Sequence, residues 1–178
     1  MCTVITHPAV PIALSALLPQ ETVSSSLLIA AALCSVVPDL DVVGFEFGIN
    51  YGDMLGHRGF THSIFFAALL AVLVTFAFFQ KNAGNQVTIF LFLFLSTLSH
   101  PVLDALTNGG LGVGLFTPFS NERYFFAYRP IEVSPIGIGA FFSHRGFKVI
   151  VSELKWVWFP SAILFGVVHL FKRMRDLS

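Results

Sequence analysis

GHRGFTHS, residues 56–63, is the stretch around which this 178-residue chain is organised. It places two imidazoles, His57 and His62, and the Arg58 guanidinium directly before an apolar run that begins at residue 64. Only 11% of the residues are charged. Polar chemistry is therefore scarce in this chain, and it is concentrated at this point.

Two further polar islands have the same character, PDLD at residues 38–41 and HPVLD at residues 100–104. Each lies at the edge of an apolar segment, and His7 lies near the start of another. Ionisable groups at membrane depth are costly unless they have partners. We therefore treat these islands together as one candidate site.

The composition indicates a membrane protein. Hydrophobic residues make up 55% of the chain, 21 residues are Phe, and the mean hydropathy is +0.79, which is too apolar for an ordinary soluble domain. The formal charge is zero and no basic block is present, so nothing indicates nucleic-acid binding. Cys2 and Cys34 form no CxxC motif. The first charged residue is Glu21, so we expect no cleavable signal peptide and keep the whole chain in the mature protein.

The apolar segments predict an all-α, polytopic membrane bundle of about four to five helices in a single domain, residues 1–178. Thr61 or Ser63 is the expected N-cap of the helix after the His-rich stretch. The expected elements are a short or re-entrant helix at 8–19, spans at about 23–38, 63–79, 87–107 and 154–171, and a long irregular, aromatic-rich loop at 109–150 before the last span.

The charges suggest an orientation. Lys172, Arg173 and Arg175 follow the last span and favour a cytoplasmic C-terminus, which also places the turn at 80–86 on that side. Basic residues in the loop at 109–150 weaken this bias, but the convergence of the polar islands holds in either orientation. The residues expected to converge on the opposite face are His7, Asp39, His57, His62, His100 and Asp104.

The spacing of these residues is typical of a metal site. His100 and Asp104 are four apart on a predicted helix, so they share a face and can meet a single ion. His57 and His62 are five apart, about 140° round a helix, which places His57 in a loop and His62 near the helix start. Imidazole and carboxylate without sulfur suit Zn best, with Mn, Fe and Ni also compatible.

Together these motifs resemble the YdjM family of inner-membrane metal-dependent hydrolases, over roughly residues 1–130. That family is similar to zinc-dependent phospholipase C and P1-type nucleases, which are all-helical zinc enzymes. A later His followed by a His-x-x-x-Glu pattern is absent here, so the resemblance does not extend to a full trinuclear site. The resemblance implies one metal set of Asp39, His57 or His62, His100 and Asp104, and a second ion that His7 helps to hold with Asp104 bridging.

The expected function is that of a hydrolase in the inner (plasma) membrane, acting on a phosphoester or lipid-linked substrate through metal-activated water. If Asp41 is not a ligand, it is the candidate general base or the residue that orients an imidazole. Arg58 is the other catalytic candidate. Arg58 and Arg123 are the candidate substrate-binding residues, because guanidinium donors match phosphate oxygens.

Two other readings remain open. The same His and Asp residues could carry metal or protons in a transporter, although such proteins often have internal repeats and midplane polar residues. Alternatively, the cluster could be a hydrogen-bonded structural element of a non-catalytic membrane protein. We interpret His169 as a structural group, and the similarity of residues 144–147 to residues 57–60 as coincidence.

Overall fold

The structure is a computed structural model that describes residues 1–81, 85–135 and 138–175. Every regular element in these ranges is a helix, apart from two isolated β-bridges that join Thr107 to Ile131 and Val113 to Tyr124. The all-α prediction is therefore confirmed.

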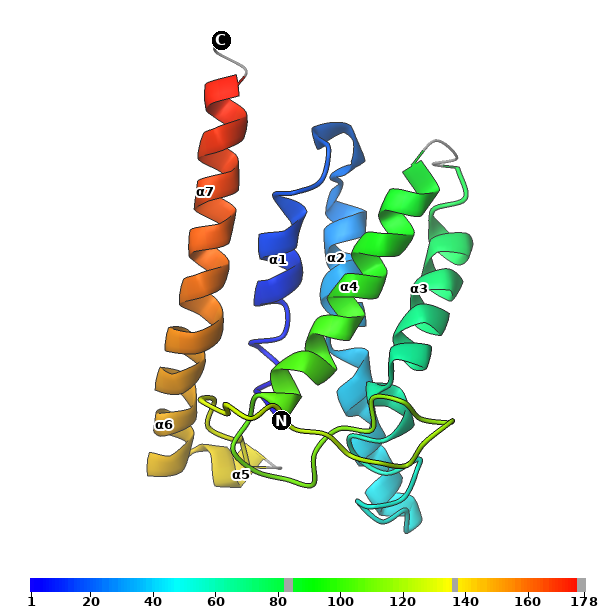
Figure 1. The fold of residues 1–178 in the computed structure, drawn as a ribbon, viewed down its shortest axis with the longest axis vertical. Helices are drawn as coiled ribbons and strands as arrows, with labels where there is room; N and C mark the ends of the chain where they lie inside the picture. The colour runs from blue at the N-terminus through cyan, green and yellow to red at the C-terminus, as the bar shows by residue number, and fades with distance from the viewer. Residues whose placement is uncertain (82–84, 136–137, 176–178) are drawn as a thin grey trace.

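Figure 1 shows the helices as a bundle with loops gathered at one end. The α-helices are α1 (Ala9–Ser15), α2 (Ser25–Cys34), α3 (Ile64–Phe78), α4 (Gln86–Ala105), α5 (Ile138–Phe141), α6 (His144–Glu153) and α7 (Phe159–Arg175). Tighter or wider turns form η1 (Gln20–Thr22), η2 (Val37–Phe47) and η3 (Phe60–His62), all 3₁₀, and the π-helical turn η5 (Leu154–Trp158).

Helix α4 packs against α1, α2 and α3, whereas α7 packs mainly against α1 at the flank of the bundle. Among the residues that the structure describes, three helical stretches are long and apolar enough to cross a membrane: Ser25–Phe47, Gln86–Ala105 and His144–Arg175. Helix α3 is apolar but shorter, with 15 residues. These lengths fit a helical membrane bundle.

Serine caps begin two of the helices. The Ser24 hydroxyl accepts a hydrogen bond from the Leu27 N–H at 3.2 Å, and the Ser63 hydroxyl accepts one from the Phe66 N–H at 3.0 Å. Each bond satisfies one of the backbone donors left free at a helix start. Of the two expected caps for α3, the structure uses Ser63.

The polypeptide after α2 differs from the prediction. The α-helix ends at Cys34, but the chain continues as η2 to Phe47, beyond the expected end of this span near residue 38. Pro38 is tolerated because it lies in the first turn of η2, where no backbone N–H is required. Gly48, with φ +77°, ends this turn.

The predicted loop at 109–150 is also too long. It contains α5, and α6 begins at His144 and continues through η5 into α7. Gly146, Val149 and Glu153 are the buried residues of α6, at the spacing of one helix face. The prediction failed because the exposed Arg145 and Lys148 make this segment polar on average.

Small and hydroxylated residues are buried in the bundle beside larger apolar side chains such as Leu27 and Leu93. Ala31 and Ala71 are fully buried, as expected where membrane helices approach closely. The buried Ser96 and Thr97 donate to the carbonyls of Phe92 and Leu93 in their own helix, which satisfies both hydroxyls.

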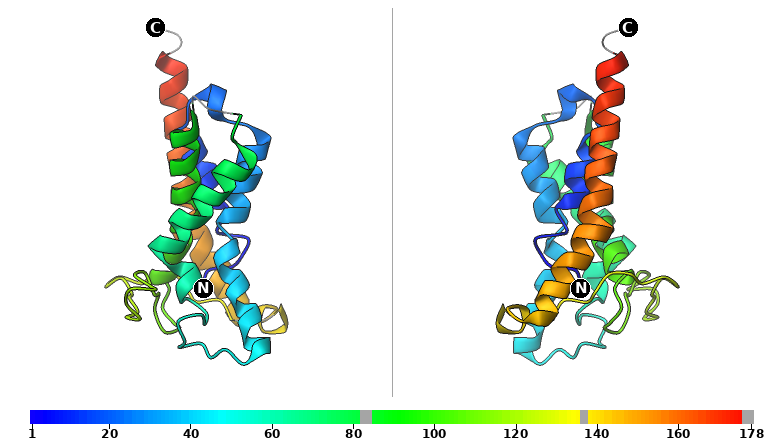
Figure 2. Two further views of the ribbon diagram at one scale, coloured as in Figure 1. Left: turned by 90° about the vertical axis from the view of Figure 1, so that its right-hand side faces the viewer. Right: turned by 90° about the vertical axis from the view of Figure 1, so that its left-hand side faces the viewer.

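The two ends of the bundle carry different structural elements. The N-terminus, η2, the loop after α4, and α5 with α6 all lie at one end, and the C-terminal end of α7 lies at the other (Figures 1 and 2). The polar islands at 38–41 and 56–63 and the C-terminal end of α4 therefore meet at the loop-bearing end.

Candidate metal centre

Four of the predicted residues form a compact group, here called the four-residue cluster: Asp39, His62, His100 and Asp104. Each offers one ligand atom, and these atoms all lie within 4.8 Å of one another. Asp39 comes from η2, His62 from η3, and the other two from α4. Asp39 is 5% exposed and the other three are fully buried, so this group is the natural place for a cation.

The two imidazoles of the cluster face each other through their Nε2 atoms, which are 3.0 Å apart. The Nδ1 atom of His100 lies 2.7 Å from the Ser35 carbonyl, to which it can only donate. The Nδ1 atom of His62 lies 3.1 Å from Asp41 Oδ2. In a neutral imidazole one nitrogen donates and the other accepts. Both Nε2 atoms are then acceptors.

The two carboxylates of the cluster lie beside these nitrogens. Asp39 Oδ1 is 3.4 Å from the Nε2 of His100 and 3.7 Å from that of His62. Neither oxygen of Asp39 has a hydrogen-bond partner within the described ranges. Asp104 Oδ2 is 3.7 Å from His62 Nε2, and Asp104 Oδ1 accepts a bond from the Cys2 N–H at 2.8 Å. Buried polar atoms without partners are costly, so the geometry favours an added cation.

Asp41 connects the cluster to His57. Its Oδ1 lies 2.7 Å from His57 Nδ1, and its Oδ2 accepts bonds from the Arg58 N–H and the Thr61 hydroxyl. Asp41, His57 and His62 form a second group whose ligand atoms lie within 4.8 Å of one another. The Nε2 of His57 has no hydrogen-bond partner among the described residues.

His7 lies beside the cluster but is not one of its four members. Its ring stacks on that of His100, with centroids 3.7 Å apart and planes at 14°. Burial, reinforced by the neighbouring His100, lowers the pKa of His7 to about 3. The imidazole is therefore neutral at physiological pH. Neither of its nitrogens has a partner in the part of the chain that the structure describes.

Arg58 does not have the open guanidinium that the sequence prediction required. The residue is fully buried and has a positive φ of 64°. Its Nε lies 2.9 Å from Asp104 Oδ2, and its Nη atoms donate to the Gly109 carbonyl and the Thr107 hydroxyl. All three nitrogens therefore contact protein partners, and a direct contact between Arg58 and a phosphate is inconsistent with this structure.

Arg123 holds the loop that leads into the His-rich stretch. Its guanidinium donates to the backbone carbonyls of His57, Tyr51 and Asp53, each at 3.0 Å. The same group lies over the Tyr51 ring, 5.9 Å from its centroid. The observed contacts of Arg123 are thus with the loop and not with the cluster.

Two glycines let the His-rich stretch fold back on itself. A Cβ at Gly56 would lie 2.1 Å from the Asn50 carbonyl oxygen, and a Cβ at Gly59 would lie 2.2 Å from that of Met54. Any side chain at these positions would displace the backbone. The glycines therefore explain the G-x-x-G spacing around His57 and Arg58.

Other supporting groups were not identified from the sequence. Glu153 of α6 is 2% exposed, and its carboxylate accepts bonds from the Thr3 N–H and the hydroxyls of Thr3 and Thr6. These hydrogen bonds hold the N-terminal turn, which leads into His7, against α6. The Ser35 carbonyl accepts a hydrogen bond from His100 Nδ1, and the Thr107 hydroxyl accepts one from Arg58. A sequence motif cannot show which backbone carbonyl will accept a hydrogen bond. Glu153 is about 150 residues away from its partners in the sequence, so no local pattern links them.

Comparisons with known proteins match nearly the whole chain. The family model described as YdjM inner membrane protein matches residues 1–175. Inner membrane protein YbcI of Escherichia coli (strain K12) is 41% identical over 173 residues, which are 97% of this chain and 100% of that protein. No solved structure matches.

Neither name refers to a reaction or a metal, so the expected similarity to phospholipase C and P1 nuclease gains no support from these comparisons. The extent of both matches nevertheless settles the family. This chain belongs to the YdjM family of inner membrane proteins.

Proposed function

We propose that the four-residue cluster binds a divalent transition metal ion, most suitably zinc, in a metal-dependent hydrolase that acts on a phosphoester or lipid-linked substrate. The observation that supports this most strongly is the approach of two imidazole nitrogens, His62 Nε2 and His100 Nε2, to 3.0 Å. When both imidazoles are neutral, these atoms carry lone pairs, which repel each other at this distance unless a cation lies between them.

The separation fits tetrahedral coordination. With Zn–N bonds of about 2.05 Å, two nitrogen ligands of one zinc ion lie about 3.3 Å apart, close to the distance observed. Asp39 and Asp104 would complete a set of two imidazoles and two carboxylates. This set contains no sulfur, and Mn, Fe and Ni also accept such ligands. His7 and His57, which have nitrogens without partners, are the candidates for holding a second ion.

A protonated His62 is the alternative explanation for the short contact. Burial opposes its protonation, but the Asp39 and Asp41 carboxylates raise the pKa of His62 to about 9. An imidazolium could then donate to His100. In this explanation Asp39 Oδ1 lies 3.7 Å from the imidazolium Nε2, beyond hydrogen-bond distance, and the His7 nitrogens have no hydrogen-bond partner among the described residues. A metal ion would bind Asp39 directly.

A bound divalent ion would supply Lewis-acid chemistry, lowering the pKa of water from ~15.7 toward ~7. The protein would supply the positioning. Asp41 directs Nδ1 of both His57 and His62 toward itself, so their Nε2 atoms point away from it as ligands. Because both oxygens of Asp41 have partners, we propose the orienting role for it and not that of general base. Arg58 would balance the charge of Asp104.

The test combines metal removal with an activity screen. Purified protein is assayed on a panel of phosphodiesters and lipid esters, before and after chelation and after metal is restored. Asp39→Asn should abolish metal-dependent turnover, because both oxygens of Asp39 are free for an ion. The exposed Asp53→Asn variant is the control. Metal binding by the parent protein without turnover on any substrate would contradict the hydrolase proposal.

The second candidate is a non-catalytic structural metal centre. Structural zinc sites have four protein ligands and no open position, and the burial of all four residues of the cluster favours this reading. Chelation would then lower the melting temperature without affecting any reaction. A transporter is less favoured because the cluster lies at one end of the bundle and not at its midplane, and ion flux in liposomes would support it.

A further inference from the structure

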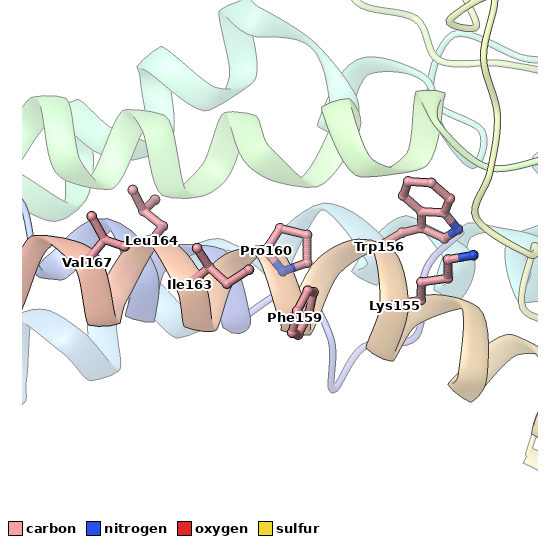
Figure 3. A pocket seen from close by; sticks show the side chains of 7 residues that line it. All are labelled: Lys155, Trp156, Phe159, Pro160, Ile163, Leu164 and Val167. Atoms are coloured by element: carbon pink, nitrogen blue, oxygen red, sulfur yellow. The ribbon is translucent and has the colours of Figure 1, made fainter.

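An apolar groove runs along the helix formed by η5 and α7, away from the candidate metal centre. Its volume is about 610 Å³, and we call it the α7 groove. Figure 3 shows its side chains in a row along the helix, with Lys155 at the end of the row. The residues that carry the argument are Lys155, Trp156, Pro160, Ile163, Leu164 and Val167.

The spacing of these residues makes the groove continuous. Trp156, Pro160, Ile163 and Val167 follow one another at steps of four, three and four residues, which keeps them on one helix face. From Trp156 to Val167 the helix rises about 16 Å. One leaflet accounts for half of the ~30 Å hydrocarbon core. The groove is therefore about as long as one acyl chain in one leaflet.

The polar end of the groove is positively charged. Lys155 is exposed, and its Nζ lies 5.0 Å from the centroid of the Trp156 ring. It forms no ion pair with any residue that the structure describes. The acid nearest to it in sequence, Glu153, is buried and bonded to Thr3 and Thr6. A Trp beside a Lys is typical of the membrane interface, and an unpaired cation there attracts anionic headgroups.

A second copy of the chain fits this face less well. Membrane helices that associate closely use small residues at the contact, whereas this stripe presents Trp156, Ile163, Leu164 and Val167. Only 6% of an 18-residue apolar stretch within His144–Arg175 is buried inside the protein. This helix face is therefore available for contact with lipid.

We propose that the α7 groove binds an anionic phospholipid, with one acyl chain along residues 156–167 and the phosphate beside Lys155. This site does not rest on the proposed metal or on the hydrolase activity. It makes α7 a lipid-binding element at the flank of the bundle.

The experiment is native mass spectrometry of the protein released from vesicles of equal parts phosphatidylglycerol and phosphatidylcholine. The parent should retain phosphatidylglycerol preferentially. Lys155→Gln should reduce that preference about five-fold, since one charge near an anionic headgroup is worth about that factor. Ile163→Trp should reduce retention of both lipids, because the larger side chain fills the groove.

Two matched variants keep the test specific. Lys148→Gln removes an exposed charge of α6, outside the groove, and should behave like the parent. Leu170→Trp enlarges an exposed α7 residue beyond the groove and should also behave like the parent. Equal losses in Lys148→Gln and Lys155→Gln would show diffuse surface attraction only and overturn the proposal. Unchanged retention in Ile163→Trp, or dimers cross-linked through Ile163→Cys, would overturn it as well.

Discussion

Asp41 is the residue that joins the two His-containing groups of the site. One oxygen lies 2.7 Å from His57 Nδ1, and the other lies 3.1 Å from His62 Nδ1. Ligating imidazoles commonly have such a carboxylate behind them, which fixes the tautomer and raises the basicity of the ligand. Removing the negative charge should therefore weaken metal binding without removing a ligand.

Asp41→Asn tests this role. The amide keeps the size of the side chain but cannot accept from both imidazoles in the same way, so metal affinity should fall about 10–100-fold. A competition titration against a chromophoric chelator measures the change. Asp53→Asn, in the exposed loop, is the control and should bind like the parent. Equal metal affinities in the two variants would contradict the proposed role of Asp41 in orienting the imidazoles.

Gly59→Ala tests the packing of the His-rich stretch. The new Cβ would lie 2.2 Å from the Met54 carbonyl oxygen, so the backbone between His57 and His62 must move. Metal content should drop and the melting temperature should fall. Gly52→Ala is the matched control, because nothing lies within 4 Å of a Cβ there. A parent-like metal content in Gly59→Ala would show that the cluster tolerates a shifted loop.

The set of candidate residues could be predicted from the sequence, but their individual roles could not. His57 and His62 were equivalent candidates, and the structure places His62 in the four-residue cluster because its Nε2 faces His100. Arg58 was expected to face a substrate, yet it contacts Asp104. These assignments depend on the direction of side chains in a loop, and residue spacing does not determine that direction.

Helix α6 anchors the N-terminal turn across the loop-bearing end. Its Glu153 carboxylate accepts three bonds from Thr3 and Thr6, and the Trp158 indole N–H also donates to the Thr6 hydroxyl. His7 follows Thr6 directly, so α6 determines where this imidazole lies. A buried carboxylate with this many donors should contribute measurably to stability.

Glu153→Gln should lower the free energy of unfolding by about 1–3 kcal/mol, because the amide leaves buried hydroxyl donors poorly satisfied. The expected readout is a lower melting temperature in detergent. Glu46→Gln replaces an exposed carboxylate and should not change it. If both variants have the melting temperature of the parent, the hydrogen bonds of Glu153 do not contribute to the stability of the protein.

At the level of elements, the long apolar runs were predicted well because a membrane span has few alternatives. Helices α3 and α4 lie within two residues of their predicted ends. The η2 turn and α6 were not predicted. In η2 the chain stays helical past Pro38, and in α6 a narrow buried face of Gly146, Val149 and Glu153 is hidden among exposed charges.

The elements that carry the site, among them η2, η3 and the C-terminal end of α4, lie at one end of the molecule, and the C-terminal end of α7 lies at the other (Figure 1). We propose that the C-terminus is cytoplasmic, because Lys172, Arg173 and Arg175 follow the last span. The site would then face the opposite side of the inner membrane. This arrangement predicts the compartment of each loop.

Reporter fusions test the arrangement. Fusions after Ser178 and within residues 80–86 should report the cytoplasm, and a fusion between residues 50 and 54 should report the far side. A fusion near residue 121 should agree with the one between 50 and 54, because both loops lie at the same end. If the C-terminal fusion and either of these loop fusions report one compartment, the spanning scheme is wrong.

Elemental analysis of the purified protein tests the central claim most directly. The parent should contain about one tightly bound transition metal ion per chain, as four convergent ligands imply. His62→Ala should lose most of that metal. His169→Ala, which changes an exposed imidazole on α7, should keep it. A metal-free parent, or equal metal content in all three proteins, would contradict the account.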